Sequence, residues 1–314
     1  MKIIDLHCDT IMECHFGNET LKTRSGHITA EKLQKGSSLA QCFALYLTKG
    51  HLPDEEQWQL YNDMYGTFLA NIGDCKDIIR RAYTADDVTK NASDGYISAI
   101  LTVEDGACVN GKAERLLKMK NDGVRMIALT WNYENCFGFP NSADSSLHSK
   151  GLKDFGKESI SLMNDLGIIV DVSHLSEGGF WDVAKITTKP FIASHSCSRS
   201  LRDHPRNLTD EQLKAIAEKG GVVGINFFYS FLTDKGNTTC ISDVIAHLEH
   251  IRKVAGIDTL AWGSDFDGIG GNLEFGDFAG FPMILDELSK HFTSDEIDKI
   301  NNLDFLRVLK EQNI

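Results

Sequence analysis

The sequence predicts an α/β fold, a (β/α)8 barrel of the TIM type, in which a single domain spans residues 1–314. Three observations favour this barrel. Eight short apolar runs recur along the chain, amphipathic segments lie between several of them, and no stretch rich in Gly, Pro or Ser divides the sequence. Strands that are apolar on both faces and alternate with helices are typical of a parallel sheet. An open doubly wound sheet is the alternative, but its GxGxxG turn and the GxxxxGK[ST] loop are both absent from the sequence.

The expected strands are short and end on polar or ionisable residues. In chain order they are KIIDLH (2–7), LAQCFALYL (39–47), YISAILTVE (96–104), VRMIALTW (124–131), GIIVDVSH (167–174), PFIASH (190–195), GVVGINFF (221–228) and TLAWGSDF (259–266). Apolar residues at helical spacing predict helices over 55–72, 153–167, 208–221 and 241–256. A further amphipathic helix is expected over residues 302–314.

Composition restricts the class of partner. The net charge is -13 and the pI about 5.3, which argues against binding to nucleic acid or to an anionic membrane. Asp5 and Asp9 interrupt any apolar signal segment at the start, and no run approaches 18 apolar residues. The eight cysteines are scattered without a CxxC pair, as expected of reduced thiols. We therefore expect a cytoplasmic protein that begins at Met1 and has no membrane partner.

Ionisable side chains follow the expected strands at the end where a parallel barrel carries its active site. His7 and Asp9 are two residues apart and share one face of the first strand, with Cys8 on the other face. The later strands end on Glu104, His174, His195 and Asp265, and the seventh strand carries Asn226. Asp267, directly before Gly268, is interpreted as a turn residue. Imidazole and carboxylate ligands without thiolate favour zinc, although manganese, iron and cobalt also accept them.

These residues suffice for two ions. His7 and Asp9 can hold one ion and His174 and His195 a second, with Glu104 as the bridging carboxylate. Two such ions about 3.5–4 Å apart share a water, lower its pKa and generate a bridging hydroxide. Asp265, on the opposite side of the barrel, is placed to accept the proton of that water. The constellation predicts metal-assisted hydrolysis of an amide or ester, with Glu104 and Asp265 as catalytic residues.

The same motifs, in the same order, resemble those of the membrane (renal) dipeptidase family, zinc peptidases of the amidohydrolase-like barrels. The motifs are HxD at 7–9, TVEDG, DVSH, SHSCSRSLRDHPRN and GSDFDG, and the resemblance covers essentially the whole chain. It implies that one zinc is bound by His7, Asp9 and Glu104. It implies that a second zinc is bound by Glu104, His174 and His195. It also implies that Asp265 lies beside the bridging water, that L,L- and L,D-dipeptides are substrates, and that the protein is a homodimer.

The resemblance assigns the substrate's carboxylate to Arg206. The planar guanidinium offers a bidentate fork that matches a carboxylate. Arg199 and Arg202 lie nearby in the sequence, and only the spacing from His195 favours Arg206.

The chain departs from the family in the stretch LTWNYENCFG. There Trp131 or Tyr133 stands where some members have a substrate-contacting histidine. Tyr133 would donate a hydrogen bond to an oxyanion, Trp131 would form a wall of the pocket, and Asn226 is expected to bind substrate as well.

Two other functions compete with the dipeptidase. The first is a different binuclear-metal amidohydrolase that acts on a small amide, lactone or ester. Many of those enzymes use a carboxylated lysine after the fourth strand, and this chain has no lysine in that strand. The second is a non-catalytic barrel that binds metal, which predicts the loss of at least one ligand or of Asp265, and none is lost.

Overall fold

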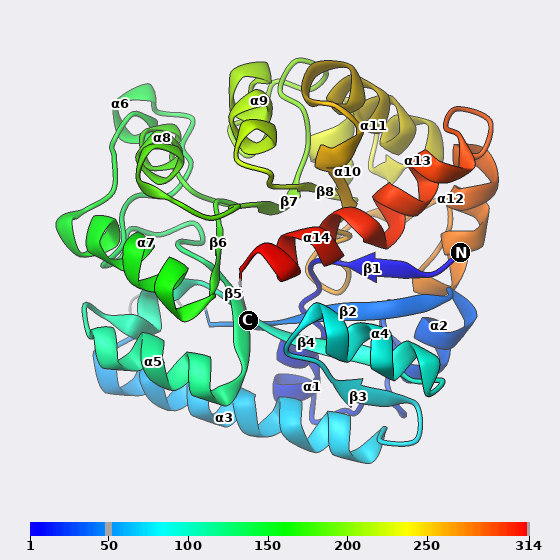
Figure 1. The fold of residues 1–314 in the computed structure, drawn as a ribbon, viewed down its shortest axis with the longest axis horizontal. Coiled ribbons are helices and arrows are strands. Elements are labelled where there is room, and N and C mark those ends of the chain that lie inside the picture. The colour runs from blue at the N-terminus through cyan, green and yellow to red at the C-terminus, as the bar shows by residue number, and fades with distance from the viewer. Residues whose placement is uncertain (48–51, 313–314) are drawn as a thin grey trace.

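Eight parallel strands form a nearly closed barrel in the computed structural model, which describes residues 1–47 and 52–312 (Figure 1). The barrel strands are β1 (Ile3–Asp5), β2 (Ser38–Tyr46), β4 (Ile97–Glu104), β5 (Val124–Ala128), β6 (Ile169–Asp171), β7 (Ala193–Ser196), β8 (Val223–Ile225) and β10 (Leu260–Trp262). Hydrogen bonds join them in the order β6-β5-β4-β2-β1-β10-β8-β7. The two ends of this path meet at one bridge, between Asp171 and Ile192. The predicted barrel is confirmed.

Within residues 1–47 and 52–312, three further strands lie outside the barrel. Each predicted apolar run overlaps one barrel strand, although most of these strands are shorter than the run. The additional strand β3 (Ile79–Arg81) pairs with the first residues of β4, ahead of the part of β4 that pairs with β5. Two short strands, β9 (Thr238–Thr239) and β11 (Asn272–Leu273), pair only with each other.

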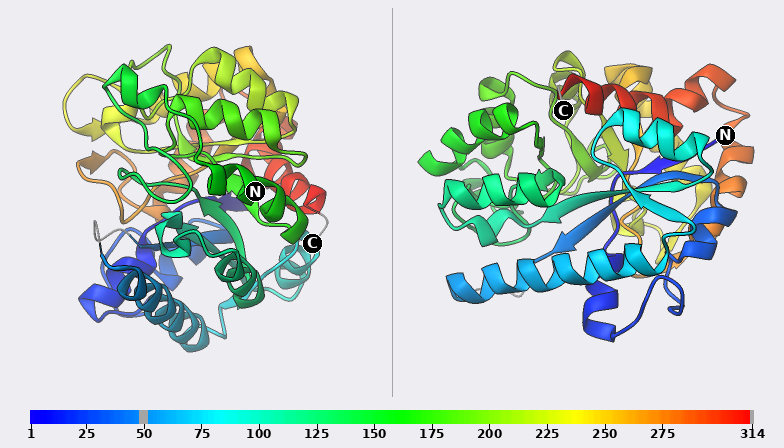
Figure 2. Two further views of the ribbon diagram at one scale, coloured as in Figure 1. Left: turned by 90° about the vertical axis from the view of Figure 1, so that its left-hand side faces the viewer. Right: turned by 60° about the horizontal axis from the view of Figure 1, so that its bottom comes forward.

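Helices surround the strands, as the two views of Figure 2 show. The α-helices are α1 (Thr10–Gly17), α2 (Ala30–Lys35), α3 (Asp54–Asp74), α4 (Ala85–Ser93), α5 (Ala113–Asp122), α6 (Ser145–His148), α7 (Asp154–Leu166), α8 (Glu177–Ile186), α9 (Asp210–Glu218), α10 (Tyr229–Leu232), α11 (Ile241–Ala255), α12 (Phe281–Leu288), α13 (Ser294–Asp298) and α14 (Asp304–Glu311). The predicted helices correspond to α3, α7, α9, α11 and α14, and the expected residues 313–314 lie outside the described chain. None of the helices in the described ranges is both long and apolar enough to cross a membrane.

Two apolar clusters hold the barrel together. The larger lies between the strands and the surrounding helices and includes Phe43, Leu101 and Trp262. The smaller joins side chains of the strands, such as Ile4 and Ile100, to Phe305, Val308 and Leu309 of the last helix. Helix α14 lies across the ring of strands in Figure 1. The other end of the barrel, where the carboxyl ends of the parallel strands lie, carries polar residues.

Candidate metal centre

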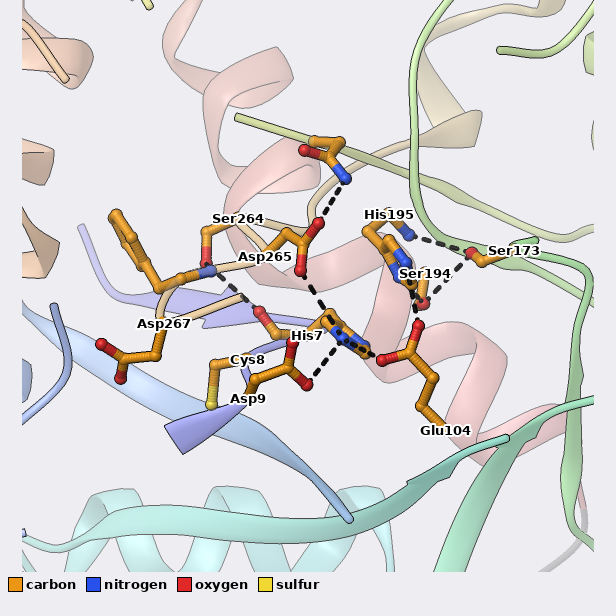
Figure 3. Close-up of polar contacts among 12 residues, drawn as sticks. His7, Cys8, Asp9, Glu104, Ser173, Ser194, His195, Ser264, Asp265 and Asp267 are labelled. Carbon is orange, nitrogen blue, oxygen red and sulfur yellow. Dashed lines mark hydrogen bonds and ion pairs between the residues drawn. The ribbon is translucent and has the colours of Figure 1, made fainter. Parts of the chain in front are cut away.

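The polar residues at the carboxyl ends of the strands converge on one site (Figure 3). His7 follows β1, Glu104 is the last residue of β4, and His195 lies within β7. His174 follows β6, and Asp9 immediately precedes α1. All five of these side chains are buried. The cysteine between His7 and Asp9 points away from the site, because its Sγ donates to the carbonyl of Cys42 on β2.

Glu104 lies at the centre of the site, and its two oxygens face different partners. Its Oε2 is 3.2 Å from Nε2 of His7, which is in turn 3.6 Å from Oδ1 of Asp9. Its Oε1 is 2.9 Å from Nε2 of His174 and 3.4 Å from Nε2 of His195. The Nε2 atoms of His174 and His195 are 2.9 Å apart. One carboxylate therefore joins two groups of potential ligands.

The spacing of these atoms fits divalent metal ions. Ligands at 2.0–2.1 Å from a tetrahedral zinc lie about 3.3 Å from one another. The separations among the five candidate ligands run from 2.9 to 3.6 Å. Nε2 of His7 and Oδ1 of Asp9 are buried and have no hydrogen-bond partner in residues 1–47 and 52–312. Buried polar atoms are rarely left in this state, so the donor set fits bound ions.

Charge and burial set the protonation of the ligands. Burial would raise the pKa of Glu104, but the neighbouring His7 and His174 hold it well below its usual range. Burial lowers the pKa of His174 to about 4 and that of His195 well below its usual range. Burial would also lower the pKa of His7, but the charge of Glu104 raises it well above the ordinary value. An ionised carboxylate and neutral imidazoles are the forms that bind a metal, so Glu104, His174 and His195 are already in the binding form, whereas His7 would release a proton as an ion binds.

Asp265 lies on the other side of His7 from Glu104. Its Oδ1 is 3.8 Å from Nε2 of His7, and its Oδ2 accepts a 2.8 Å hydrogen bond from Nδ2 of Asn226. Burial raises the pKa of Asp265 to about 7, and the nearby charges of Asp9 and Glu104 add to the increase. Asn226, expected to bind substrate, thus contacts the carboxylate that the sequence assigns to proton transfer.

Two site residues have a backbone conformation that side chains seldom adopt. The φ angles of His174 and Asp265 are 67° and 61°, in the left-handed region. Such angles cost of order 1–3 kcal/mol and persist where the surrounding structure fixes them. Each residue lies three positions after the end of a barrel strand, so the turn out of that strand aims the side chain at the site.

The site opens into a cavity of about 480 Å³. Asp9, Glu104, His174 and Asp265 contribute its polar wall, and its apolar wall includes Met12, Tyr46, Trp131, Phe228, Phe231 and Ile269. The ring of Trp131 stands edge-on to that of Tyr46, with centroids 5.2 Å apart. Within the described chain Tyr133 is not among the lining residues, and it is 41% exposed. Trp131, not Tyr133, is therefore the aromatic residue of this stretch that borders the cavity.

Arg206 is buried beside His195. Its Nη2 donates a 3.3 Å hydrogen bond to the carbonyl of His195, and its guanidinium lies 5.4 Å from the ring centroid of Phe231. Burial lowers its pKa. Its competitor Arg199 donates instead to the backbone carbonyls of Pro205 and Asn207. Of these two arginines, only Arg206 reaches a backbone atom of a metal-ligand candidate.

Sequence reasoning missed the residues that support the ligands. Nδ1 of His174 is 3.0 Å from Oδ1 of Asn132, which follows β5. Nδ1 of His195 is 2.7 Å from Oγ of Ser194, whose hydroxyl also contacts Asp171. The only sequence signal was position, because each of these residues neighbours a predicted ligand or strand end.

Comparison with known proteins identifies the family. The chain is 36% identical over 242 residues to a Klebsiella pneumoniae protein encoded in the pqqA 5′ region, covering 74% of this chain and 88% of that one. It is 35% identical over 233 residues to an uncharacterised dipeptidase of Schizosaccharomyces pombe, covering 72% of this chain and 56% of that one.

Solved structures share the whole fold. A family M19 metallopeptidase named dipeptidase AC superposes with a TM-score of 0.92 at 26% identity, covering 99% of this chain and 98% of its own. A Rhodobacter sphaeroides metallopeptidase, bound to a phosphinate mimic of L-Ala-D-Ala, gives 0.91 at 25% identity and covers 99% of both chains. The membrane dipeptidase family model matches residues 1–314. The resemblance seen in the motifs is thus confirmed, and the chain belongs to the membrane dipeptidase family, peptidase family M19, as a metallo-dipeptidase.

Proposed function

We propose that this metallo-dipeptidase uses two zinc ions to hydrolyse the amide bond of small L,L- and L,D-dipeptides. The observation that carries the proposal is the division of the Glu104 carboxylate. Its Oε2 faces His7, and its Oε1 faces His174 and His195. We assign one ion to His7, Asp9 and Glu104, and the other to Glu104, His174 and His195. The all-nitrogen and oxygen donor set supports zinc over a thiolate-preferring metal.

Asp265 would move the proton in this reaction. Divalent ions held by these ligands would supply Lewis-acid chemistry, lowering the pKa of a water and polarising the amide carbonyl. Asp265 would accept a proton from the attacking water through Oδ1, which faces the ligand side of the site at 3.8 Å from Nε2 of His7. It then passes the proton to the nitrogen of the leaving amine. Asn226 holds the other oxygen, so the accepting oxygen keeps its direction.

The size and lining of the cavity support a short substrate. A volume of about 480 Å³ accommodates a dipeptide with a bulky side chain. The apolar wall of Trp131, Phe228 and Ile269 makes few demands on side-chain chemistry. We infer that Arg206 recognises the free carboxylate, after its side chain turns from the His195 carbonyl toward the cavity. The D-residue is inferred from the L-Ala-D-Ala mimic bound by the Rhodobacter relative.

The decisive experiment pairs metal content with turnover. We expect plasma emission spectrometry of the purified protein to find about two zinc ions per chain. We expect hydrolysis of a panel of L,L- and L,D-dipeptides that a chelator abolishes and added zinc restores. Two ions per chain without dipeptide turnover would refute the proposal that dipeptides are the substrate, and would favour another small amide, a lactone or an ester. Fewer than two ions at full activity would refute the two-metal assignment.

A further inference from the structure

Asp171 is a buried carboxylate at the end of β6 that has no part in the reaction proposed above. Its Oδ1 accepts the backbone N–H groups of Ser173 and Ser194, at 2.9 and 3.0 Å. Its Oδ2 lies 2.5 Å from Oγ of Ser194. The Ser194 hydroxyl donates its single hydrogen to this oxygen of Asp171.

This direction determines which nitrogen of His195 carries a hydrogen. Oγ of Ser194 is 2.7 Å from Nδ1 of His195, and its own hydrogen is already committed to Asp171. The hydroxyl can therefore only accept, and Nδ1 must donate. The contacts of Ser173 are consistent with this pattern. Its Oγ accepts the backbone N–H of His195 at 3.2 Å, so its own hydrogen is free to be donated to Oγ of Ser194 at 3.3 Å (Figure 3).

We propose that Asp171 and Ser194 are positioning residues that hold His195 in the Nδ1–H tautomer. In that tautomer the lone pair of Nε2 points toward Oε1 of Glu104, 3.4 Å away. Nε2 must be unprotonated to bind a metal, so the pair prepares the ligand before any ion arrives. The inference rests on the proposed two-metal site and extends it to the residues behind the ligands.

A second pair of residues, Asp5 and Ser264, has the same hydrogen bonds between carboxylate and serine, but within the described chain its hydroxyl does not contact an imidazole. Asp5 accepts the backbone N–H and the hydroxyl of Ser264 at 2.8 and 2.7 Å, as Asp171 does with Ser194. Ser264 contacts the backbone carbonyl of His7, at 3.2 Å, instead of a ring nitrogen. Both carboxylates are buried beside a metal-ligand candidate. Asp5→Asn is thus a control for the loss of a buried charge at such a position.

The test is Asp171→Asn. The asparagine Oδ1 would keep the two backbone N–H groups, which leaves its NH₂ group facing Oγ of Ser194. Ser194 would then accept from the amide and donate to Nδ1 of His195, so the hydrogen of the ring would move to Nε2. We expect long-range ¹H–¹⁵N spectra of metal-free, histidine-labelled protein to show Nδ1–H for His195 in the wild type and in Asp5→Asn, but Nε2–H in Asp171→Asn.

Metal affinity provides the second measurement. We expect chelator competition to show zinc binding 10–100-fold weaker in Asp171→Asn than in Asp5→Asn. An Nε2–H tautomer in the wild type, or equal tautomers and affinities in the two variants, would overturn the proposal. If Asp171→Asn does not fold, Ser194→Ala replaces it, and zinc affinity equal to the wild type would count against the proposal. The spectra need no substrate, so a protein with the Nδ1–H tautomer but no dipeptide turnover would refute the proposed function alone.

Discussion

Asp265 is placed by three independent features of the chain. Its φ of 61° turns the side chain back toward the strand ends, Asn226 holds one carboxylate oxygen, and burial raises its pKa to about 7. No hydrogen bond or ion pair with a lysine or arginine of the described chain is found at its carboxylate. A carboxylate in this state is suited to take up and release a proton near neutral pH.

Replacing this carboxylate should separate metal binding from catalysis. In Asp265→Asn we expect about two zinc ions to remain while kcat falls by roughly 10²–10⁴-fold, the range typical of a lost general base. Zinc content and dipeptide turnover measure the two properties. Asp286→Asn, the same change at an exposed position on α12, serves as the control. Unchanged turnover in Asp265→Asn would remove this residue from the mechanism.

Loss of the Arg206 side chain should raise KM for dipeptides with a free C-terminal carboxylate more than for amidated ones. In Arg206→Ala we expect KM for free dipeptides to rise at least 10-fold, because a charge-assisted bidentate pair is lost. C-terminally amidated dipeptides should show little change in KM. Arg202→Ala, in the same loop, provides the comparison. An equal rise for free and amidated substrates would refute the carboxylate-binding role.

At the scale of elements, the loop after β10 brings several parts of the site together. Asp267 was interpreted as a turn residue, and the turn exists, because Gly268 N–H donates to the carbonyl of Asp265. The carboxylate of Asp267 also binds Nη1 of Arg24 and the backbone N–H of His27, at 2.5 and 2.6 Å. These partners are more than 200 residues away in sequence, so local turn chemistry could not reveal them.

Gly268 should tolerate no side chain. A Cβ at this position would lie 2.0 Å from Oδ2 of Asp9 and 2.7 Å from Oδ1 of Asp265. We expect Gly268→Ala to weaken zinc binding by at least 10-fold, because Asp9 must leave its place. Gly270→Ala is the matched control, since its Cβ would meet no atom within 4 Å. Chelator competition on both variants measures the effect, and equal affinities would show that Asp9 moves without cost.

Prediction from sequence succeeded where the signal is local and failed where it depends on neighbouring strands. Apolar runs located every barrel strand, because a strand buried on both faces must be apolar. Strand β3 was missed because IRR has one apolar residue and two arginines. The candidate ligands could be grouped from the sequence because parallel strands end together. The contact of Asp171 with Ser194 was not found, because it depends on how β6 and β7 meet.

At the scale of the whole molecule, stability depends on pH through a buried acid far from the metal centre. Asp304 begins α14, and its Oδ2 is buried without a hydrogen-bond partner in the described residues. Burial raises its pKa from 3.8 to about 7, although Arg307 opposes the shift. The folded protein therefore binds the proton more tightly than the unfolded chain. The resulting stabilisation is complete below about pH 4 and is lost as the pH rises to about 7.

Asp304→Asn should remove this dependence. We expect the metal-free variant to be more stable than the wild type at pH 8 by roughly 1–2 kcal/mol, and nearly equal to it at pH 4.5. Thermal unfolding in chelator at both pH values measures the difference. Asp286→Asn should change neither value. A difference that is the same at both pH values would rule out titration of Asp304 as the cause.

The homodimer and the cytoplasmic location remain predictions from the sequence. The shape of the barrel itself follows from its strand order, which returns β10 to the side of β1. The first and last barrel strands are neighbours, so no contiguous fragment contains a closed ring.

This order has a consequence for synthesis of the chain. The ligands leave the ribosome in sequence: His7 and Asp9 first, Glu104 next, then His174 and His195, and Asp265 near the end. A nascent chain thus contains every proposed zinc ligand before it contains Asp265, the proposed proton acceptor. Until β10 emerges, β1 also lacks one of its two hydrogen-bonded neighbours. An ion bound early would therefore be held by an incomplete barrel. The last fifth of the chain to be translated supplies both β10, which completes the ring of strands, and Asp265, the proposed proton acceptor.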